Sequence, residues 1–321
     1  MRPAPCRSLS SFCRAIFSRI CDKFFAIVKQ IVPIRFWIDD LRRVSEILVC
    51  SRETSQWFSV ALDYLGLRKL PYPYELRLRT GEGIVLREHT DAIVFWTVFA
   101  RRHYPVTASH HVIVDVGANI GMFTLYAARK ARQARIISIE PFPDTRLHLE
   151  KMVKANHLDD RVTILDCAIS SHAEERRMDS AIGIPSQYRR IFAPETKTLN
   201  MRHRRSTAAL QKDAGVPVRT ETLGYVLDRT GVDVVDLVKM NIHGSEYDVL
   251  LSTDPRILQR CREIAVQYHE MPAEMRLGKQ QIFDHLGQLG FRLISDRDTK
   301  SGSGLAILAA SPEVISVAPA A

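Results

Sequence analysis

The hydrophobic pattern after residue 110 alternates between two periods. Short runs of branched apolar residues suit strands that are buried on both faces. They are separated by segments in which apolar residues recur every three or four positions, as in helices. This alternation predicts an α/β fold with a doubly wound, mostly parallel sheet. The predicted parallel strands are residues 111–116, 135–140, 162–165, 236–242 and 263–269, and the predicted helices are 122–128, 145–157 and 272–289.

The two ends of this alternating region have different patterns. Residues 291–295 and 305–309 flank a polar stretch that contains two glycines, which predicts a terminal antiparallel hairpin. Upstream, the predicted elements are helices at 41–67 and 90–104, with Thr90 or Asp91 as the N-cap of the second, and a strand pair at 74–79 and 84–87.

The N-terminal arm, residues 1–43, is both apolar and basic. Charged residues interrupt it so often that no run of about 20 uncharged residues remains, and a membrane-spanning helix is not predicted. Its apolar residues recur at helical spacing. The arm is therefore predicted either to pack on the main domain or to lie on an anionic membrane surface, with Cys6, Cys13 and Cys21 as candidate acylation sites. The predicted divisions are a basic helical extension at 1–71, one domain at 72–310 and a disordered tail at 311–321.

The formal net charge of +9 is concentrated in two segments. Residues 1–43 contain nine Lys and Arg against three acids, and residues 176–219 contain ten against three, so the rest of the chain is slightly acidic. No zinc-finger spacing and no basic helix with interleaved aromatics occurs, so nucleic-acid binding is not predicted. The six cysteines form no Cys-x-x-Cys pair. No metal site is predicted, and a cytoplasmic, reducing compartment is expected.

The most informative motif joins the first predicted strand to its helix. It reads Val-Asp-Val-Gly-Ala-Asn-Ile-Gly at 114–121, and its glycines allow a tight turn and a close approach to a ligand. The spacing Asp-x-Gly-x-x-x-Gly is not the one that holds a dinucleotide pyrophosphate. An acid at position 115 would repel a pyrophosphate and suits a positively charged group, such as the amino group of S-adenosylmethionine.

A second acid follows the next predicted strand. Glu140 ends the run at 135–140, where a carboxylate can accept hydrogen bonds from both ribose hydroxyls of an adenosine. The two acids together predict an S-adenosylmethionine site. An NAD-dependent oxidoreductase, and a strand–turn–helix unit in which the acid is only a cap, are the alternatives.

With these residues identified, the chain resembles the FkbM family of S-adenosylmethionine-dependent methyltransferases over about residues 72–310. The motif at 114–121 matches the family's first motif, Ile139–Pro141 its second, and Asp166–Ser170 a polar and small-apolar turn near the adenine. Residues 239–246, Lys-Met-Asn-Ile-His-Gly-Ser-Glu, lie where the family usually has Lys-Ile-Asp-Val-Glu-Gly-x-Glu. The resemblance implies a class I methyltransferase fold that is Rossmann-like. It also implies a cofactor site formed by Asp115, Gly117, Ala118, Asn119, Gly121, Glu140 and Asp166.

The resemblance implies methylation of a hydroxyl on a sugar, a polysaccharide or glycolipid, or another natural product. This chain departs from the family pattern at four acids, which here are Gly224, Asn241, His243 and Gln267. His243 is the candidate general base, because an imidazole titrates near neutrality, and Asn241 and His269 complete the candidate catalytic set. His243 as a solvated residue of a degenerate cofactor-binding module and His269 as a structural hydrogen-bonding residue remain alternatives. Lys239 is expected to pair with a carboxylate such as Glu246.

The acceptor's charge is suggested by the arginine-rich segment 176–219, which connects the third and fourth predicted strands. Connections at that position can line an acceptor pocket, and arginine forks pair bidentately with carboxylates and phosphates. An anionic acceptor, a solvated loop without a ligand, and membrane contact together with residues 1–43 are the interpretations that the sequence leaves open.

Overall fold

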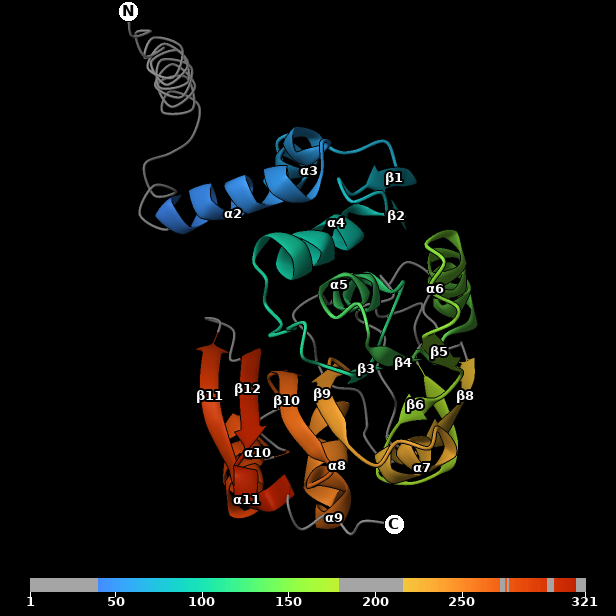
Figure 1. Ribbon diagram of the computed structural model, residues 1–321, viewed down its shortest axis with the longest axis vertical. Coiled ribbons are helices and arrows are strands. Elements are labelled where there is room, and N and C mark those ends of the chain that lie inside the picture. The colour runs from blue at the N-terminus through green and yellow to red at the C-terminus, as the bar shows by residue number, and fades with distance from the viewer. Residues whose placement is uncertain (1–39, 179–215, 272–274, 276, 299–302, 316–321) are drawn as a thin grey trace, which may run out of the picture. The chain divides into compact units, whose positions relative to one another are not determined.

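The computed structural model describes residues 40–178, 216–271, 275, 277–298 and 303–315 (Figure 1). The chain divides into two compact units, Met1–Val49 and Cys50–Ala321. The predicted arm up to residue 39 lies outside the described residues. The predicted boundary at 71/72 lies inside the second unit, which contains every candidate site residue.

A seven-stranded sheet forms the centre of the second unit, in the order β11-β12-β10-β9-β3-β4-β5 (Figure 1). All pairs from β10 to β5 are parallel, and β12 pairs antiparallel with both β10 and β11. The predicted plan of five parallel strands closed by an antiparallel hairpin is confirmed. The strands are β3 (Val112–Val116), β4 (Arg135–Ile139), β5 (Val162–Leu165), β9 (Val235–Met240), β10 (Cys261–Tyr268), β11 (Phe291–Asp298) and β12 (Gly304–Ala310).

Helices cover both faces of this sheet because the strand order reverses between β3 and β9. Right-handed crossovers on opposite sides of that point place their helices on opposite faces. Figure 1 shows α5 and α6 on one side of the strands and α8 and α10 on the other. The helices are α5 (Met122–Lys130), α6 (Pro143–Ala155), α7 (Leu223–Arg229), α8 (Ser245–Ser252), α9 (Pro255–Leu258) and α10 (Lys279–Gln288).

The elements before the central sheet differ from the predicted ones in detail. The helix expected at 41–67 is two helices, α2 (Asp40–Glu53) and α3 (Trp57–Tyr64), and the strand pair is β1 (Tyr74–Arg77) with β2 (Gly83–Leu86). The helix expected at 90–104 is α4 (His89–Phe95) followed by the π-helical turn η2 (Trp96–Ala100).

The predicted caps of α4 are wrong. Glu88 is the N-cap, and the Asp91 carboxylate accepts a hydrogen bond from the backbone N–H of Arg87 at 2.8 Å. Asp91 thus lies inside the first turn and satisfies a donor that precedes the helix, while the Thr90 hydroxyl donates to the Glu88 carboxylate at 2.7 Å.

Contacts of Asp63 attach the segment before residue 72 to the rest of the second unit. The fully buried Asp63 carboxylate accepts hydrogen bonds from the Leu70 backbone at 2.9 Å and the Tyr72 hydroxyl at 2.6 Å. It also lies 2.8 Å from His89 Nδ1. These contacts attach α3 and its following loop to α4.

A second, three-stranded sheet was not predicted. It has the order β6-β8-β7, formed by β6 (Ala168–Ile169), β7 (Glu174–Met178) and β8 (Val216–Glu221). Glu174–Met178 is almost entirely charged and lacks the apolar alternation of a strand. In β8, Val216, Val218 and Thr220 alternate with polar positions, but Pro217 argues against a strand. The tail was also predicted without structure, whereas Pro312–Ile315 form the short helix α11, which a proline can start.

Among the described residues, no helix is both long and apolar enough to cross a membrane. The large apolar core of the second unit lies between the strands around β9 and helices α7, α8 and α10. The packing of this core holds the strands in place, and with them the carboxyl ends at which the candidate site lies.

Candidate active site

The candidate site lies at the carboxyl ends of the parallel strands. In an open α/β sheet, ligands bind at this edge where the strand order reverses, here between β3 and β9. The loop of residues 117–121 follows β3, and Glu140 follows β4. Asn241 and His243 follow β9, His269 follows β10, and Asp166 follows β5. The structure therefore brings the sequence-predicted residues to one edge.

The glycine loop after β3 is tightly packed against the loop after β9. Gly117 has a φ of +78°, and a Cβ there would lie 2.3 Å from the backbone oxygen of Asn241. Gly121 has a φ of +91°, and its Cβ would lie 2.2 Å from Met152 Cε. The backbone of Asn241 therefore excludes a side chain at Gly117. At Gly121 the positive φ disfavours a side chain, and Met152 of α6 would have to move to admit one. Ala118 between them is 3% exposed.

Asp115 lies beneath this loop and is fully buried. One carboxylate oxygen accepts a hydrogen bond from Lys239 Nζ at 2.8 Å, and the other accepts one from the Thr124 hydroxyl at 2.8 Å. Lys239 also donates to the backbone oxygen of Gly117 at 2.8 Å. The expected pairing of Lys239 with Glu246 is wrong, because Asp115 and Lys239 are register partners on adjacent parallel strands. Asp115 holds the glycine loop through Lys239.

Glu140 faces the glycine loop from the end of β4. Its Oε2 accepts a hydrogen bond from the backbone N–H of Asn119 at 2.8 Å, and its Oε1 accepts one from Phe142 at 3.1 Å. The residue is 5% exposed, and burial raises the pKa of its carboxyl to about 7, against the lowering effect of these two N–H groups. A carboxylate has about four lone-pair positions, so two remain for other donors.

The residue predicted at the adenine side is the most exposed of the set. The Asp166 side chain is 62% exposed and lies 3.5 Å from Arg219 of β8 in an ion pair. Arg219 also contacts Glu221 at 3.2 Å. The unpredicted second sheet therefore contributes the residue that holds Asp166.

The candidate catalytic residues form a connected row across the ends of β9 and β10. His243 Nδ1 lies 3.1 Å from His269 Nε2, and His269 Nδ1 lies 2.7 Å from Glu246 Oε1. The same carboxylate accepts hydrogen bonds from the backbone N–H groups of His269 at 2.8 Å and Gly244 at 2.7 Å. His243 has a φ of +55°, an uncommon conformation for a residue with a side chain.

A polar group of neutral residues lies beside this row. The Asn241 side-chain amide donates to Gln267 Oε1 at 3.1 Å, and the Tyr104 hydroxyl donates to the same oxygen at 3.4 Å. Asn241 Oδ1 is buried and has no hydrogen-bond partner within the described part of the chain, so it can accept from a bound group. Sequence reasoning missed Tyr104, which lies far from any motif.

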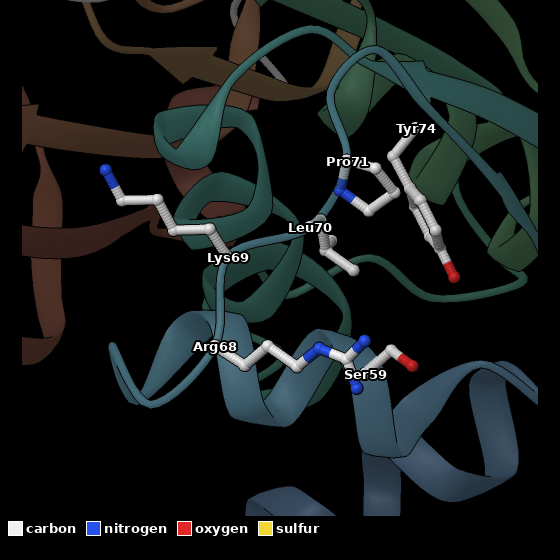
Figure 2. A pocket seen from close by; sticks show the side chains of 6 residues that line it. All are labelled: Ser59, Arg68, Lys69, Leu70, Pro71 and Tyr74. Carbon is white, nitrogen blue, oxygen red and sulfur yellow. The ribbon is translucent and has the colours of Figure 1, made fainter.

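The other candidate features are the arginine-rich segment, a metal site and a surface pocket. The arginines at 189–190 and 202–205 are outside the described residues. Among those described, no group of three His, Cys, Asp or Glu residues has the arrangement of a metal site. A surface pocket of about 370 Å³ is lined by Ser59, Arg68, Lys69, Leu70, Pro71 and Tyr74 (Figure 2). None of these is a predicted site residue, and Figure 2 shows Arg68 pointing toward Ser59 while Lys69 points away.

The strand order, the glycine loop and the acid after the second strand together define a class I, Rossmann-like methyltransferase fold. A family model described as the methyltransferase FkbM domain matches residues 115–293, more than half of the chain. The chain therefore belongs to the FkbM methyltransferase family, whose members use S-adenosylmethionine as the methyl donor.

The individual proteins to which the chain is similar share less than 30% of its residues over the matched segments. The chain is 28% identical over 219 residues to methyltransferase sdnD of Sordaria araneosa, covering 64% of this chain and 83% of that protein. It is 26% identical over 200 residues to the 31-O-demethyl-FK506 methyltransferase FkbM of Streptomyces tacrolimicus, covering 58% and 75%. A crystal structure of precorrin-6y C5,15-methyltransferase from Geobacter metallireducens superposes with a TM-score of 0.36 at 12% identity, covering 71% and 91%. The family assignment rests on the family model.

Proposed function

We propose that this protein is an O-methyltransferase that transfers the methyl group of S-adenosylmethionine to a hydroxyl of a sugar, a polysaccharide or glycolipid, or another natural product. The observation that carries the proposal is the buried Glu140 carboxylate, which faces the glycine loop with lone pairs to spare. The O-methyl reaction is supported by the relative whose name is 31-O-demethyl-FK506 methyltransferase.

The residues at the ends of β3 and β4 fit an adenosine-containing cofactor. Glu140 would accept hydrogen bonds from the ribose hydroxyls, and Asn119, Ala118, Gly117 and Gly121 would form the wall that the cofactor approaches. Asp166 would lie on the adenine side. Asp115 is fully buried beneath the glycine loop, where it binds Lys239 and Thr124, so we assign it to positioning the loop rather than to direct contact with the amino group.

The residues after β9 and β10 would act on the acceptor. Bound S-adenosylmethionine supplies an electrophilic methyl group, and the protein's contribution is to orient the acceptor hydroxyl and remove its proton. His243 is assigned as the general base. Asn241, through its unpartnered Oδ1, would accept a hydrogen bond from a second hydroxyl of the acceptor. His269 contacts His243 and is assigned to its support.

The test of this function is methyl transfer from radiolabelled S-adenosylmethionine to fractionated glycans, lipid-linked sugars and small polyols. We expect a labelled product, and the variant His243→Ala is expected to lose most of the rate while it retains cofactor binding. His285→Ala is the control, because His285 lies on α10 outside the site. Cofactor binding without any labelled product would favour a degenerate binding module, and an unchanged rate in His243→Ala would contradict the base assignment.

The acceptor and the location of the protein remain parts of this proposal. An anionic acceptor is proposed from the ten basic residues at 176–219, and contact with an anionic membrane from the nine at 1–43; a cytoplasmic location is proposed from cysteine usage. Sedimentation with vesicles containing phosphatidylserine, with and without residues 1–43, tests the membrane contact. Equal sedimentation of both forms would refute the role of the arm.

A further inference from the structure

The Glu246 carboxylate is fully buried and is the fixed end of the row that leads to His243. It accepts three hydrogen bonds, from the backbone N–H groups of Gly244 and His269 and from the His269 ring. A carboxylate in this arrangement only accepts, so the ring nitrogen that faces it, His269 Nδ1, carries a proton.

The tautomer of His269 determines which nitrogen donates in its contact with His243. A neutral imidazole has one protonated nitrogen and one acceptor. Because Nδ1 of His269 donates to Glu246, its Nε2 is the acceptor. This Nε2 lies 3.1 Å from His243 Nδ1, so Nδ1 of His243 is the donor in that contact.

The same reasoning fixes the second histidine. If Nδ1 of neutral His243 carries the proton, its Nε2 holds the lone pair. We propose that Glu246, acting through His269, is a positioning residue that holds His243 in the tautomer whose Nε2 accepts a proton. This inference rests on the proposed function, in which His243 is the general base. It assigns Glu246 and His269 as the residues that orient that base.

Several contacts keep the row rigid. The His269 side chain is 13% exposed, and its backbone carbonyl accepts a hydrogen bond from the Tyr247 hydroxyl at 2.9 Å. The rings of His243 and His269 have centroids 4.7 Å apart and planes tilted by 55°. Gly244, held by Glu246, directly follows His243, so the carboxylate fixes the backbone as well as the tautomer.

In the proposed step one proton moves from the acceptor hydroxyl to His243. When the acceptor hydroxyl loses its proton to His243 Nε2, the imidazole becomes an imidazolium that still donates from Nδ1 to His269. The electron pair of the broken O–H bond remains on the acceptor oxygen and forms the bond to the methyl group. The bond between that methyl group and the sulfur of S-adenosylmethionine would break, with its electron pair staying on the sulfur of the departing S-adenosylhomocysteine. The negative charge of Glu246, one ring away, stabilises the new positive charge on His243.

Nitrogen-15 NMR of the full chain with labelled histidine tests the proposal without an acceptor. In the wild-type protein, above the pH at which His243 is protonated, we expect its Nδ1 to resonate as a protonated nitrogen and its Nε2 as an unprotonated one. The signals are assigned by their loss in His243→Asn. A wild-type His243 with the proton on Nε2 would overturn the proposal.

Two variants break the row at different links. Glu246→Leu offers no acceptor to His269, and His269→Phe removes the acceptor for His243 Nδ1 while keeping a ring. In each, His243 is expected to show averaged signals of two tautomers, whereas His285→Phe leaves the wild-type pattern. An unchanged His243 pattern in a folded Glu246→Leu or His269→Phe protein would contradict the proposal. If Glu246→Leu does not fold, the wild-type spectrum and His269→Phe still decide.

Binding separates this inference from the proposed function. Calorimetry with S-adenosylhomocysteine is expected to give the same affinity within about twofold for wild type and His269→Phe, because the row lies on the acceptor side. Absence of binding in the wild type would contradict the proposed function. Normal binding of S-adenosylhomocysteine together with the opposite His243 tautomer would contradict only the positioning role of Glu246 and His269.

Discussion

The raised pKa of Glu140 predicts that cofactor binding strengthens as the pH rises through neutrality. The pKa of this carboxyl increases from 4.5 to about 7, first because the group is buried; Asp115 adds to the effect, while Lys239 and two backbone N–H groups oppose it. In the proposed site the ribose hydroxyls would donate hydrogen bonds to Glu140, so the ionised carboxylate is the form expected to bind well.

The magnitude follows from the ionised fraction. With a pKa of about 7, roughly a tenth of Glu140 is ionised at pH 6 and roughly nine tenths at pH 8, and the apparent Kd scales inversely with the competent fraction. The affinity for S-adenosylhomocysteine is therefore expected to increase by about tenfold between these pH values. Glu140→Gln should bind about tenfold or more weaker at pH 8, because a hydrogen bond to a charged acceptor contributes about 1.5–3 kcal/mol.

The stability of the cofactor-free protein is expected to change in the opposite direction. A carboxyl whose pKa is raised on folding retains its proton in the folded state after the unfolded chain has lost its own. Its unfavourable contribution therefore develops as the pH rises from about 4.5 to about 7. Between pH 5 and pH 8 the free energy of unfolding should decrease by about 2.5 kcal/mol in wild type relative to Glu140→Gln.

Calorimetric titrations and urea denaturation at pH 5, 6, 7 and 8 measure both effects in the two proteins. The variant serves as the reference, because other groups that titrate in this range are common to both. A pH dependence of affinity and stability that is the same in wild type and Glu140→Gln would refute the reasoning.

Two further substitutions test the packing in and beneath the glycine loop. Gly117→Ala should lower the free energy of unfolding by at least about 2 kcal/mol more than Gly231→Ala, since both glycines have positive φ but only at Gly117 would the Cβ meet a backbone atom, at 2.3 Å; equal losses in urea denaturation would contradict the close packing. Lys239→Met should cost about 3–5 kcal/mol because it leaves Asp115 buried without its cation. Asp115→Asn in the same chain should recover part of that loss, and a cost below about 1 kcal/mol for Lys239→Met would show that the pair is not needed.

The central sheet could be predicted because its inner parallel strands are buried on both faces and are therefore mostly apolar, as in Val112–Val116 and Arg135–Ile139. The gathering of Glu140, His243 and His269 at one edge followed from the same plan, since the carboxyl ends of parallel strands meet there. The fold and the location of the site thus depend on local patterns together with a rule of topology.

The pairing of particular side chains could not be predicted in this way. Lys239 contacts Asp115, 124 positions earlier, because the register of β3 and β9 places them side by side. No short turn joins these two strands, so the sequence offers no turn geometry that would fix their register. Likewise, β7 is stabilised by its antiparallel pairing with β8, although its charged sequence, Glu174–Met178, does not resemble a buried strand. Tyr104 reaches Gln267 across 163 positions, with no motif to mark it.

A calorimetric titration of the wild-type protein with S-adenosylmethionine, and a parallel one with NAD, tests the central claim most directly. Asp115, the glycine loop and Glu140 predict one S-adenosylmethionine bound per chain and much weaker or no binding of NAD, because the site lacks a glycine arrangement for a pyrophosphate. Tighter binding of NAD, or no heat with S-adenosylmethionine at any pH from 6 to 8, would contradict the account.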